Sequence, residues 1–265
     1  MSETKKDLKG RLKTAIYVCQ SAGKALMALR DLDLPLKMVG TQLKSTADIA
    51  ADKWIRTIIE SIYPNDYIIS EETDNKIRSY KLDKFWVLDP LDGTKSYHGG
   101  YNGFCVQIAY VDNKQIQIAV VYWPVKNKTY WAIKDQGSYV EFKRKTTKLM
   151  VSKKRKIYID SHRARGRCLK IIQELGTDKF MELGSYGLKI CNIAEGKADI
   201  FIKNVPSMIW DIAPGSLILS EAGGTLTTWK GEAFVNPFKD KLTTLLVSSK
   251  DNHKEFLDKI KLFNA

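Results

Sequence analysis

Apolar residues recur every three or four positions in six stretches of the chain, and this spacing predicts amphipathic helices. The first helix is expected over residues 8–29 and the second from about Asp48 to Ile62. The buried side of the second helix should carry Ala51, Trp54, Ile55, Ile58 and Ile62. The remaining four helices are expected at 168–175, 188–195, 211–221 and 252–262.

Short apolar runs bounded by Gly, Pro, Asp and Asn predict the strands. Runs at 67–69 and 85–88 lead directly into acidic residues, Glu71 and Glu72 after the first run and Asp89 after the second. Four further runs are joined by short turns, as in an antiparallel meander, at 104–111, 116–122, 129–133 and 138–142. In the second half, strands at 157–161, near 181, 198–202, 224–228 and 245–248 alternate with helices. The pattern predicts a layered α/β fold.

The chain has 265 residues, enough for a substantial core, and 44% of them are hydrophobic. A basic segment after the meander suggests a boundary between an N-terminal α+β domain, residues 1–148, and a C-terminal α/β domain, residues 149–265. No apolar run approaches the ~20 residues of a membrane span, and the N-terminus lacks a secretory pattern. We therefore expect a cytoplasmic protein that does not enter membranes. Four scattered cysteines, without zinc-site spacing, predict free thiols.

Charge is strongly uneven along the chain, whose formal net charge is +13. Between residues 142 and 159 there are eight basic residues and no acid. Such a segment either forms a solvated lysine-rich surface or attracts an anionic partner. Single-stranded nucleic acids need several aromatic faces, and this segment offers only Phe142 and Tyr158. We therefore do not expect a nucleic-acid partner, although a binding module with an idle catalytic site is the competing hypothesis.

The segment from Asp89 to Thr94 places two carboxylates and a hydroxyl on one predicted turn after an apolar strand. Pro90 fixes one backbone angle, and Gly93 permits a left-handed conformation. Strand ends of this kind are where open α/β sheets place their ligands. Two neighbouring carboxylates repel each other, so the turn favours binding of a cation.

Asp211 is the third acidic position of interest, because it opens a predicted helix in which Pro214 is tolerable only in the first turn. Each of these acids alone could be a helix cap or a surface residue. Acids at two strand ends and one helix start together indicate a metal site. Carboxylates without Cys or His suit hard cations, so Mg²⁺ is expected.

Two other phosphate-handling families fit the sequence around the Asp-Gly-Thr turn less well. Haloacid-dehalogenase phosphatases have one residue between the two acids, whereas Pro90 and Leu91 stand between them here, and no segment matches a P-loop. The chain instead resembles the inositol monophosphatase superfamily of Mg²⁺-dependent, lithium-sensitive phosphatases. The resemblance rests on three motifs in matching order, at 89–94, 70–72 and 210–215. It implies an alternating helix-sheet-helix-sheet-helix sandwich and a phosphoric monoester hydrolase.

The resemblance implies two or three Mg²⁺ ions per active site. Glu71, Asp89 and the Leu91 carbonyl would hold the first ion, and Asp89, Asp92 and Asp211 the second. Thr94 and Asp48 would orient and deprotonate the attacking water, and Glu71 would also take part in catalysis. The implied substrate contacts are Asp92, Gly93, Thr94, Lys95, His162, Ser185 and Asp211. The chain departs from the family at Ser70, usually Gly, and at Pro214, usually Ala.

Within the superfamily the chain looks most similar to the 3′(2′),5′-bisphosphate nucleotidases, which remove the 3′-phosphate of 3′-phosphoadenosine 5′-phosphate. Lys95 after the Asp-Gly-Thr turn and the Ser161-His162 pair carry this similarity. Asp160 stands where that subfamily commonly has Arg. The alternative substrate is an inositol or sugar monophosphate. By analogy alone, the protein could be a homodimer.

Overall fold

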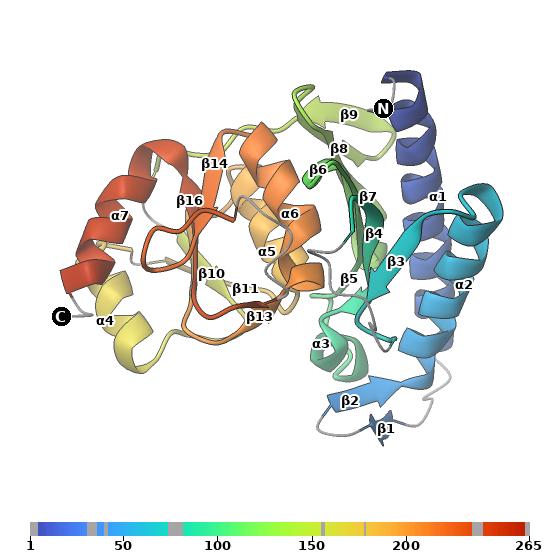
Figure 1. Ribbon diagram of the computed structural model, residues 1–265. Coiled ribbons are helices and arrows are strands. Elements are labelled where there is room, and N and C mark those ends of the chain that lie inside the picture. Colours follow the sequence, from blue (N-terminus) through green and yellow to red (C-terminus); the bar gives the residue numbers. More distant parts are fainter. Residues whose placement is uncertain are drawn as a thin grey trace.

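The computed structural model describes residues 5–30, 36–39, 42–73, 82–154, 157–177, 179–234 and 241–262. These residues form alternating layers of helix and sheet, which confirms the predicted fold class (Figure 1). Helices α1 (Lys5–Arg30) and α2 (Thr46–Ile62) cover the outer face of the first sheet. Helices α5 (Tyr186–Ala194) and α6 (Ile209–Glu221) lie between the two large sheets. Helices α4 (Gly166–Glu174) and α7 (Lys250–Leu262) lie on the outer side of the second.

The first sheet, as far as the chain is described, has seven strands that are neighbours in sequence order. They are β3 (Tyr67–Ser70), β4 (Lys84–Asp92), β5 (Cys105–Asp112), β6 (Gln115–Trp123), β7 (Lys128–Ile133), β8 (Ser138–Phe142) and β9 (Lys145–Lys148). Strands β3 and β4 are parallel, and all later neighbours are antiparallel. The predicted meander is therefore confirmed.

The second sheet has the order β11-β10-β12-β16-β14. Its strands are β10 (Ile157–Asp160), β11 (Lys179–Glu182), β12 (Ile200–Lys203), β14 (Gly224–Thr227) and β16 (Leu245–Ser249). Strand β10 is parallel to β11 and β12, whereas β16 is antiparallel to β12 and β14. This mixed sheet supports α5 and α6 from the side opposite to the meander.

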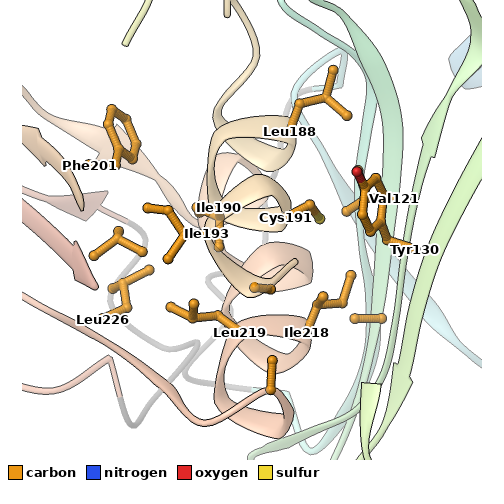
Figure 2. Packing of buried hydrophobic residues seen from close by; sticks show 14 of the residues in the cluster. Val121, Tyr130, Leu188, Ile190, Cys191, Ile193, Phe201, Ile218, Leu219 and Leu226 are labelled. Carbon is orange, nitrogen blue, oxygen red and sulfur yellow. The ribbon is translucent and has the colours of Figure 1, made fainter. Parts of the chain in front are cut away.

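The largest buried cluster fills the space between the two sheets (Figure 2). Leu188, Cys191 and Ile218 project from α5 and α6 toward Val121 and Tyr130 of the first sheet. The opposite faces of the same helices meet the second sheet. Because α5 and α6 are apolar on both sides, they hold the sheets at a fixed separation. The boundary proposed at residue 148 coincides with the end of β9, and the division into two domains stays a proposal.

The buried face of helix α2 differs in part from the predicted one. Ala51 and Ile55 are buried as expected, but Trp54 is 49% exposed and Ile62 is 51% exposed. The buried face is completed by Ile59 and by Asp52, whose carboxylate binds Arg56. The buried face is therefore rotated about the helix axis, away from Trp54 and Ile62 and toward Asp52 and Ile59.

Several short elements were not predicted. Strands β1 (Leu36–Val39) and β2 (Gln42–Ser45) form a separate hairpin, and β13 (Ser207–Met208) pairs with β15 (Lys241–Leu242). Helix α3 (Thr94–His98), the 3₁₀ turn η2 (Pro124–Lys126) and strand β9 were also missed. In the described part of the chain no helix is long and apolar enough to span a membrane. The four cysteines are free, as expected.

His253 of α7 gives the fold a pH dependence that can be tested. Its ring is buried between the Thr227 and Ser248 hydroxyls, each 2.8 Å from a ring nitrogen, and burial lowers its pKa from 6.5 to about 4. As pH falls from 6.5 to 4, the unfolded chain gains a proton that the buried ring does not accept, so stability is lost by up to about 3 kcal/mol. In urea unfolding series over this range, the difference in free energy of unfolding between His253→Gln and wild type should change with pH by that amount, whereas the difference for the exposed His162→Gln should stay constant.

Candidate active site

Strand β4 brings Asp89 and Asp92 to one place by a bulge. The ladder with β5 pairs Asp89 with Gln107 and Asp92 with Cys105, and its register shifts between the two pairs. The strand therefore continues to Asp92, which corrects the prediction that it ends before Asp89. Pro90 is tolerated because a bulge releases it from the ladder. Both carboxylates are buried, with exposures of 1% for Asp89 and 6% for Asp92.

Gly93 ends the bulge with a left-handed conformation, as predicted, at φ 99°. A Cβ atom there would lie 2.7 Å from the Gly103 carbonyl oxygen, so a larger residue would have to displace backbone. Helix α3 begins at the next residue, and the Thr94 hydroxyl donates to the Leu91 carbonyl at 3.3 Å. The Leu91 carbonyl and the Thr94 side chain are thus held beside the two aspartates.

Glu71 reaches the same place from the neighbouring strand. It follows β3, and its backbone N–H donates to the Leu88 carbonyl at 3.3 Å. Asp48, in the first turn of α2, is 2% exposed and lies close enough to raise the pKa of Glu71 by its negative charge. The structure therefore brings the predicted residues Asp48 and Glu71 together.

Asp211 enters from α6, but not in the predicted position. Met208 is the N-cap, and Asp211 is the third helical residue, where its carboxylate accepts from the Met208 backbone N–H at 2.6 Å. Pro214 consequently lies inside the helix, beyond the first turn that was predicted for it. Because proline lacks an N–H, the Trp210 carbonyl loses its partner four residues further along the helix.

Gln107 of β5 supplies the missing partner, and sequence reasoning did not find it. Its side-chain Nε2 lies 3.0 Å from the Trp210 carbonyl, 3.2 Å from Asp92 Oδ2 and 3.4 Å from Asp89 Oδ2. One buried amide thus contacts both aspartates of the bulge and the first turn of α6. No motif marked this residue, because its role depends on the proline that opposes it.

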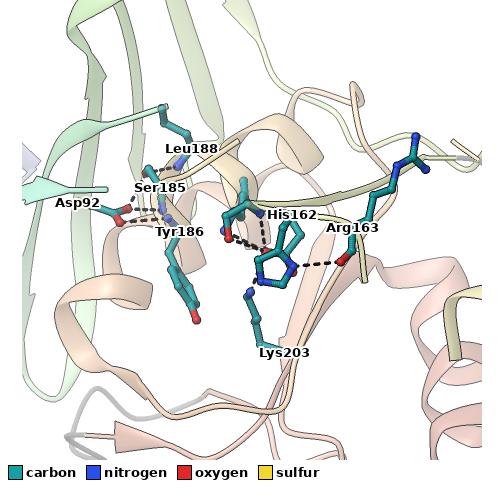
Figure 3. Close-up of polar contacts among 11 residues, drawn as sticks. Asp92, His162, Arg163, Ser185, Tyr186, Leu188 and Lys203 are labelled. Carbon is teal, nitrogen blue, oxygen red and sulfur yellow. Dashed lines mark hydrogen bonds and ion pairs between the residues drawn. The ribbon is translucent and has the colours of Figure 1, made fainter. Parts of the chain in front are cut away.

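The start of α5 forms a second set of donors around Asp92. The Ser185 hydroxyl and the backbone N–H groups of Tyr186 and Gly187 lie 2.6, 3.1 and 2.7 Å from the Asp92 oxygens (Figure 3). Ser185 is also the N-cap of α5, where it accepts from the Leu188 N–H. Ser185 is fully buried, and its role as a substrate contact stays a prediction.

The gathered carboxylates shift one another's protonation. Burial and the charges of Asp211 and Glu72 raise the pKa of Glu71 to about 8. Burial, with Asp92, raises the pKa of Asp211 to about 7. Burial also raises the pKa of Asp89 well above its usual range and that of Asp92 to a degree, while Ser185 and Gly187 oppose the shift at Asp92. Burial is the largest cause at all four acids, and neighbouring carboxylates add to it at Glu71, Asp89 and Asp211.

A hollow of about 350 Å³ opens over these groups. It is lined by eight of the residues predicted for the site, namely Glu71, Asp89, Leu91, Asp92, Gly93, Thr94, Lys95 and Asp211. A neighbouring hollow of about 640 Å³ is lined by His162 and Tyr101 and shares Lys95, Ser96, Ser161 and Gly184 with the first. The carboxylates therefore face a space that continues into a larger one. In the described residues, no three Asp, Glu, His or Cys side chains already stand at metal-binding distances.

Asp160 forms ion pairs with two lysines beside the second hollow. Its carboxylate lies 3.2 Å from the buried Lys189 amine and 2.8 Å from that of Lys203, and it accepts from the Ser161 N–H (Figure 3). Burial opposes ionisation of Asp160, but the two lysines outweigh it and lower its pKa. His162 projects separately, with its Nδ1 3.0 Å from the Arg163 carbonyl. The residue that departs from the subfamily pattern is thus an internal counter-ion.

Comparison with known proteins places this arrangement in a family. The chain is 31% identical over 237 residues to the 3′(2′),5′-bisphosphate nucleotidase CysQ of Escherichia coli strain K12, covering 83% of this chain and 96% of that protein. It is 32% identical over 200 residues to a fructose-1,6-bisphosphatase/inositol-1-monophosphatase of Aquifex aeolicus, with 72% and 73% covered. The structure matches the IMPase of Thermotoga maritima with a TM-score of 0.82 at 24% identity, covering 96% and 98% of the two chains.

The inositol monophosphatase family model matches residues 7–262, nearly the whole chain. This confirms the resemblance drawn from the three motifs and the predicted enzyme class, phosphoric monoester hydrolase. The protein with the bulged Asp89–Asp92 strand, the acid after β3 and the acid of α6 belongs to the inositol monophosphatase family.

Proposed function

We propose that the protein is a Mg²⁺-dependent phosphatase that removes the 3′-phosphate from 3′-phosphoadenosine 5′-phosphate. The observation that carries the proposal is the meeting of Glu71, Asp89, Asp92 and Asp211 at one hollow. This hollow opens into a larger one, whose lining includes Lys95, His162 and Glu182. Membership of a phosphatase family and the likeness to a bisphosphate nucleotidase support it.

The donor set fits a hard divalent cation. Four carboxylates and the Leu91 carbonyl line the smaller hollow, and no Cys or His is among its lining residues, which suits Mg²⁺ better than zinc. Burial and, after it, repulsion by neighbouring carboxylates raise the pKa values of Glu71 and Asp211, and a cation would relieve the repulsion. Glu71, Asp89 and the Leu91 carbonyl would hold one ion, and Asp89, Asp92 and Asp211 another. Bound Mg²⁺ would stabilise charge on the phosphoryl group and make water a better nucleophile.

The side chains around the bulge have separate tasks in the proposed reaction. Thr94 and Asp48, with Glu71 beside them, would orient the attacking water and receive its proton. Gly93 and Thr94 would present backbone N–H groups to the phosphate. Since attack and departure of the leaving group must be in line, the protein contributes by positioning these groups, and no protein nucleophile is needed.

The second hollow suits a nucleotide leaving group. Lys95 and His162 lie on its walls, where the 5′-phosphate could be bound, and the exposed ring of Tyr101 is available to a base. Lys189 and Lys203 are already paired with Asp160. The second phosphate would therefore depend on Lys95 and His162. An inositol or sugar monophosphate, the alternative favoured by the Aquifex aeolicus relative, would leave both residues without a phosphate partner. A homodimer stays a prediction.

Substitution of the bulge acids tests the proposed chemistry. Asp89→Asn and Asp92→Asn each remove a charge from the proposed ion site, so Mg²⁺-dependent phosphate release should fall more than about 100-fold while the fold persists. Activity is measured as released phosphate and folding as the thermal midpoint. Asp258→Asn, an exposed acid of α7, is the matched control and should retain full activity. Full turnover by either bulge variant would contradict the assigned roles.

Substrate identity is tested at Lys95. Turnover of 3′-phosphoadenosine 5′-phosphate should exceed that of inositol 1-phosphate in kcat/KM. Lys95→Ala should reduce kcat/KM for the bisphosphate roughly 10-fold, mainly through KM, because a charge-assisted contact is lost. Adenosine 3′-phosphate lacks the second phosphate, so Lys95→Ala removes no charged contact to it. Its kcat/KM should therefore fall less than about twofold. Equal losses for both nucleotides would show that Lys95 does not recognise the 5′-phosphate.

The contact between Gln107 and the carbonyl freed by Pro214 is tested by a double substitution. Gln107→Leu leaves buried acceptors unsatisfied and should lower the free energy of unfolding by about 1–3 kcal/mol. It should also weaken Mg²⁺ binding about 10-fold or more, as loss of ligand support does.

Pro214→Ala returns an N–H to the Trp210 carbonyl. The Gln107→Leu, Pro214→Ala double variant should therefore regain part of the lost stability in urea unfolding but not the lost affinity in Mg²⁺ calorimetry. Recovery of both quantities would mean that Gln107 acts on α6 alone and does not position the carboxylates.

A further inference from the structure

The basic segment that the proposed function leaves unused lines a third hollow, of about 910 Å³, at the far edge of the first sheet. Its walls come from η2 and the start of β7, from the β8–β9 hairpin, and from the residues after α5. The lining residues are Lys126, Lys128, Val140, Phe142, Lys143, Lys145, Thr147, Lys148, Leu149, Met150, Glu195 and Lys197. It shares no lining residue with the two hollows of the active site.

Positive charge in this hollow is far from balanced. Six lysines line it, and Glu195 is the one carboxylate among the lining residues. Glu195 is already bound to Lys128, at 2.6 and 2.7 Å, and to Lys197, at 2.8 Å. Lys126, Lys143, Lys145 and Lys148 have no carboxylate partner within the described part of the chain. Their repulsion is relieved by solvent or by an anion.

Protection of a sheet edge explains only part of this pattern. Strand β9 is an edge strand, and lysines on such strands prevent pairing with other sheets. That role requires Lys145 and Lys148, but it does not require three lysines from η2, β7 and the end of α5 to face the same space.

The hairpin turn adds an independent observation. Lys143 and Arg144 both have left-handed backbone angles, φ 52° and 62°, at the two positions where Asn and Gly are favoured. Each such residue costs of order 1 kcal/mol, so basic side chains are kept at this rim against local conformational preference.

We propose that this hollow binds a compact, multiply phosphorylated anion, of the size of an oligophosphate group. Its volume lies within the range of small-molecule sites, and flexible lysines bind phosphate as point charges. Nucleic acid fits less well. Phe142 is the one aromatic side chain among the lining residues, and the Lys128 and Lys143 amines lie 5.8 and 5.4 Å from its ring centre. Single-stranded nucleic acids need several free rings for stacking.

Calorimetric titration of inorganic tripolyphosphate into the metal-free full chain at physiological salt tests the proposal. Wild-type protein should bind one tripolyphosphate per chain, and the Lys143→Glu, Lys145→Glu, Lys148→Glu variant should bind at least 10 times more weakly. The matched control, Lys9→Glu, Lys13→Glu, Lys24→Glu, changes the net charge equally on exposed positions of α1 and should bind within twofold of wild type. Thermal midpoints of both variants show that they remain folded.

The remaining outcomes overturn the proposal. Equal weakening in both triple variants would mean that tripolyphosphate affinity depends only on the net charge of the protein. Retained affinity in the hairpin variant together with loss in Lys95→Ala would place the anion in the active site. Binding of a single-stranded 12-nucleotide RNA that the hairpin variant abolishes, without tripolyphosphate binding, would assign the surface to nucleic acid. None of these measurements uses turnover, so their failure is separate from failure of the proposed phosphatase activity.

Discussion

Mutual repulsion among four buried carboxylates is the constraint on which the site depends. Glu71, Asp89, Asp92 and Asp211 come from three separate parts of the chain. Besides burial, the charges of Glu71, Asp92 and Asp211 all raise the pKa of Asp89. An isolated cluster of this kind would separate or become protonated. Here the bulge in β4 and the helix of Asp211 are fixed by apolar layers on both sides, so the acids cannot move apart. The layered core therefore maintains an arrangement that its own electrostatics oppose.

Hydrogen-bond donors around the cluster make this arrangement tolerable. Asp92 accepts from Ser185, Tyr186 and Gly187 at the start of α5, where the helix dipole also favours negative charge. Gln107 joins the bulge to α6 through the carbonyl that Pro214 leaves free. A Cβ on Gly187 would lie 2.2 Å from the Gln107 side-chain oxygen, so the donors of α5 and the amide of β5 fit against each other only with glycine there.

The parts of the site that sequence could predict are those whose chemistry is local. Asp89, Asp92 and Gly93 stand in one motif, and the apolar run before them predicts the strand that carries them. Periodicity likewise predicted the long helices and the meander. The supporting contacts were not predictable. The amide of Gln107 contacts both aspartates of β4 and the carbonyl that a proline 107 residues later leaves free, and no local pattern links these groups.

Periodicity failed where a buried helix face includes acids. On α2, Asp48 and Asp52 lie on the buried face beside Ile59, whereas Trp54 lies outside that face and its indole donates to the Ser21 hydroxyl on α1. Asp160 illustrates the same limit within the proposed specificity region. In the sequence, Asp160 in place of Arg suggests that a positive charge is lost from this motif. In the structure Lys189 and Lys203 both contact the Asp160 carboxylate, so the three side chains together carry one net positive charge. Under the proposed function, discrimination among substrates would therefore depend on the accessible Lys95 and His162 and not on the paired Lys189 and Lys203.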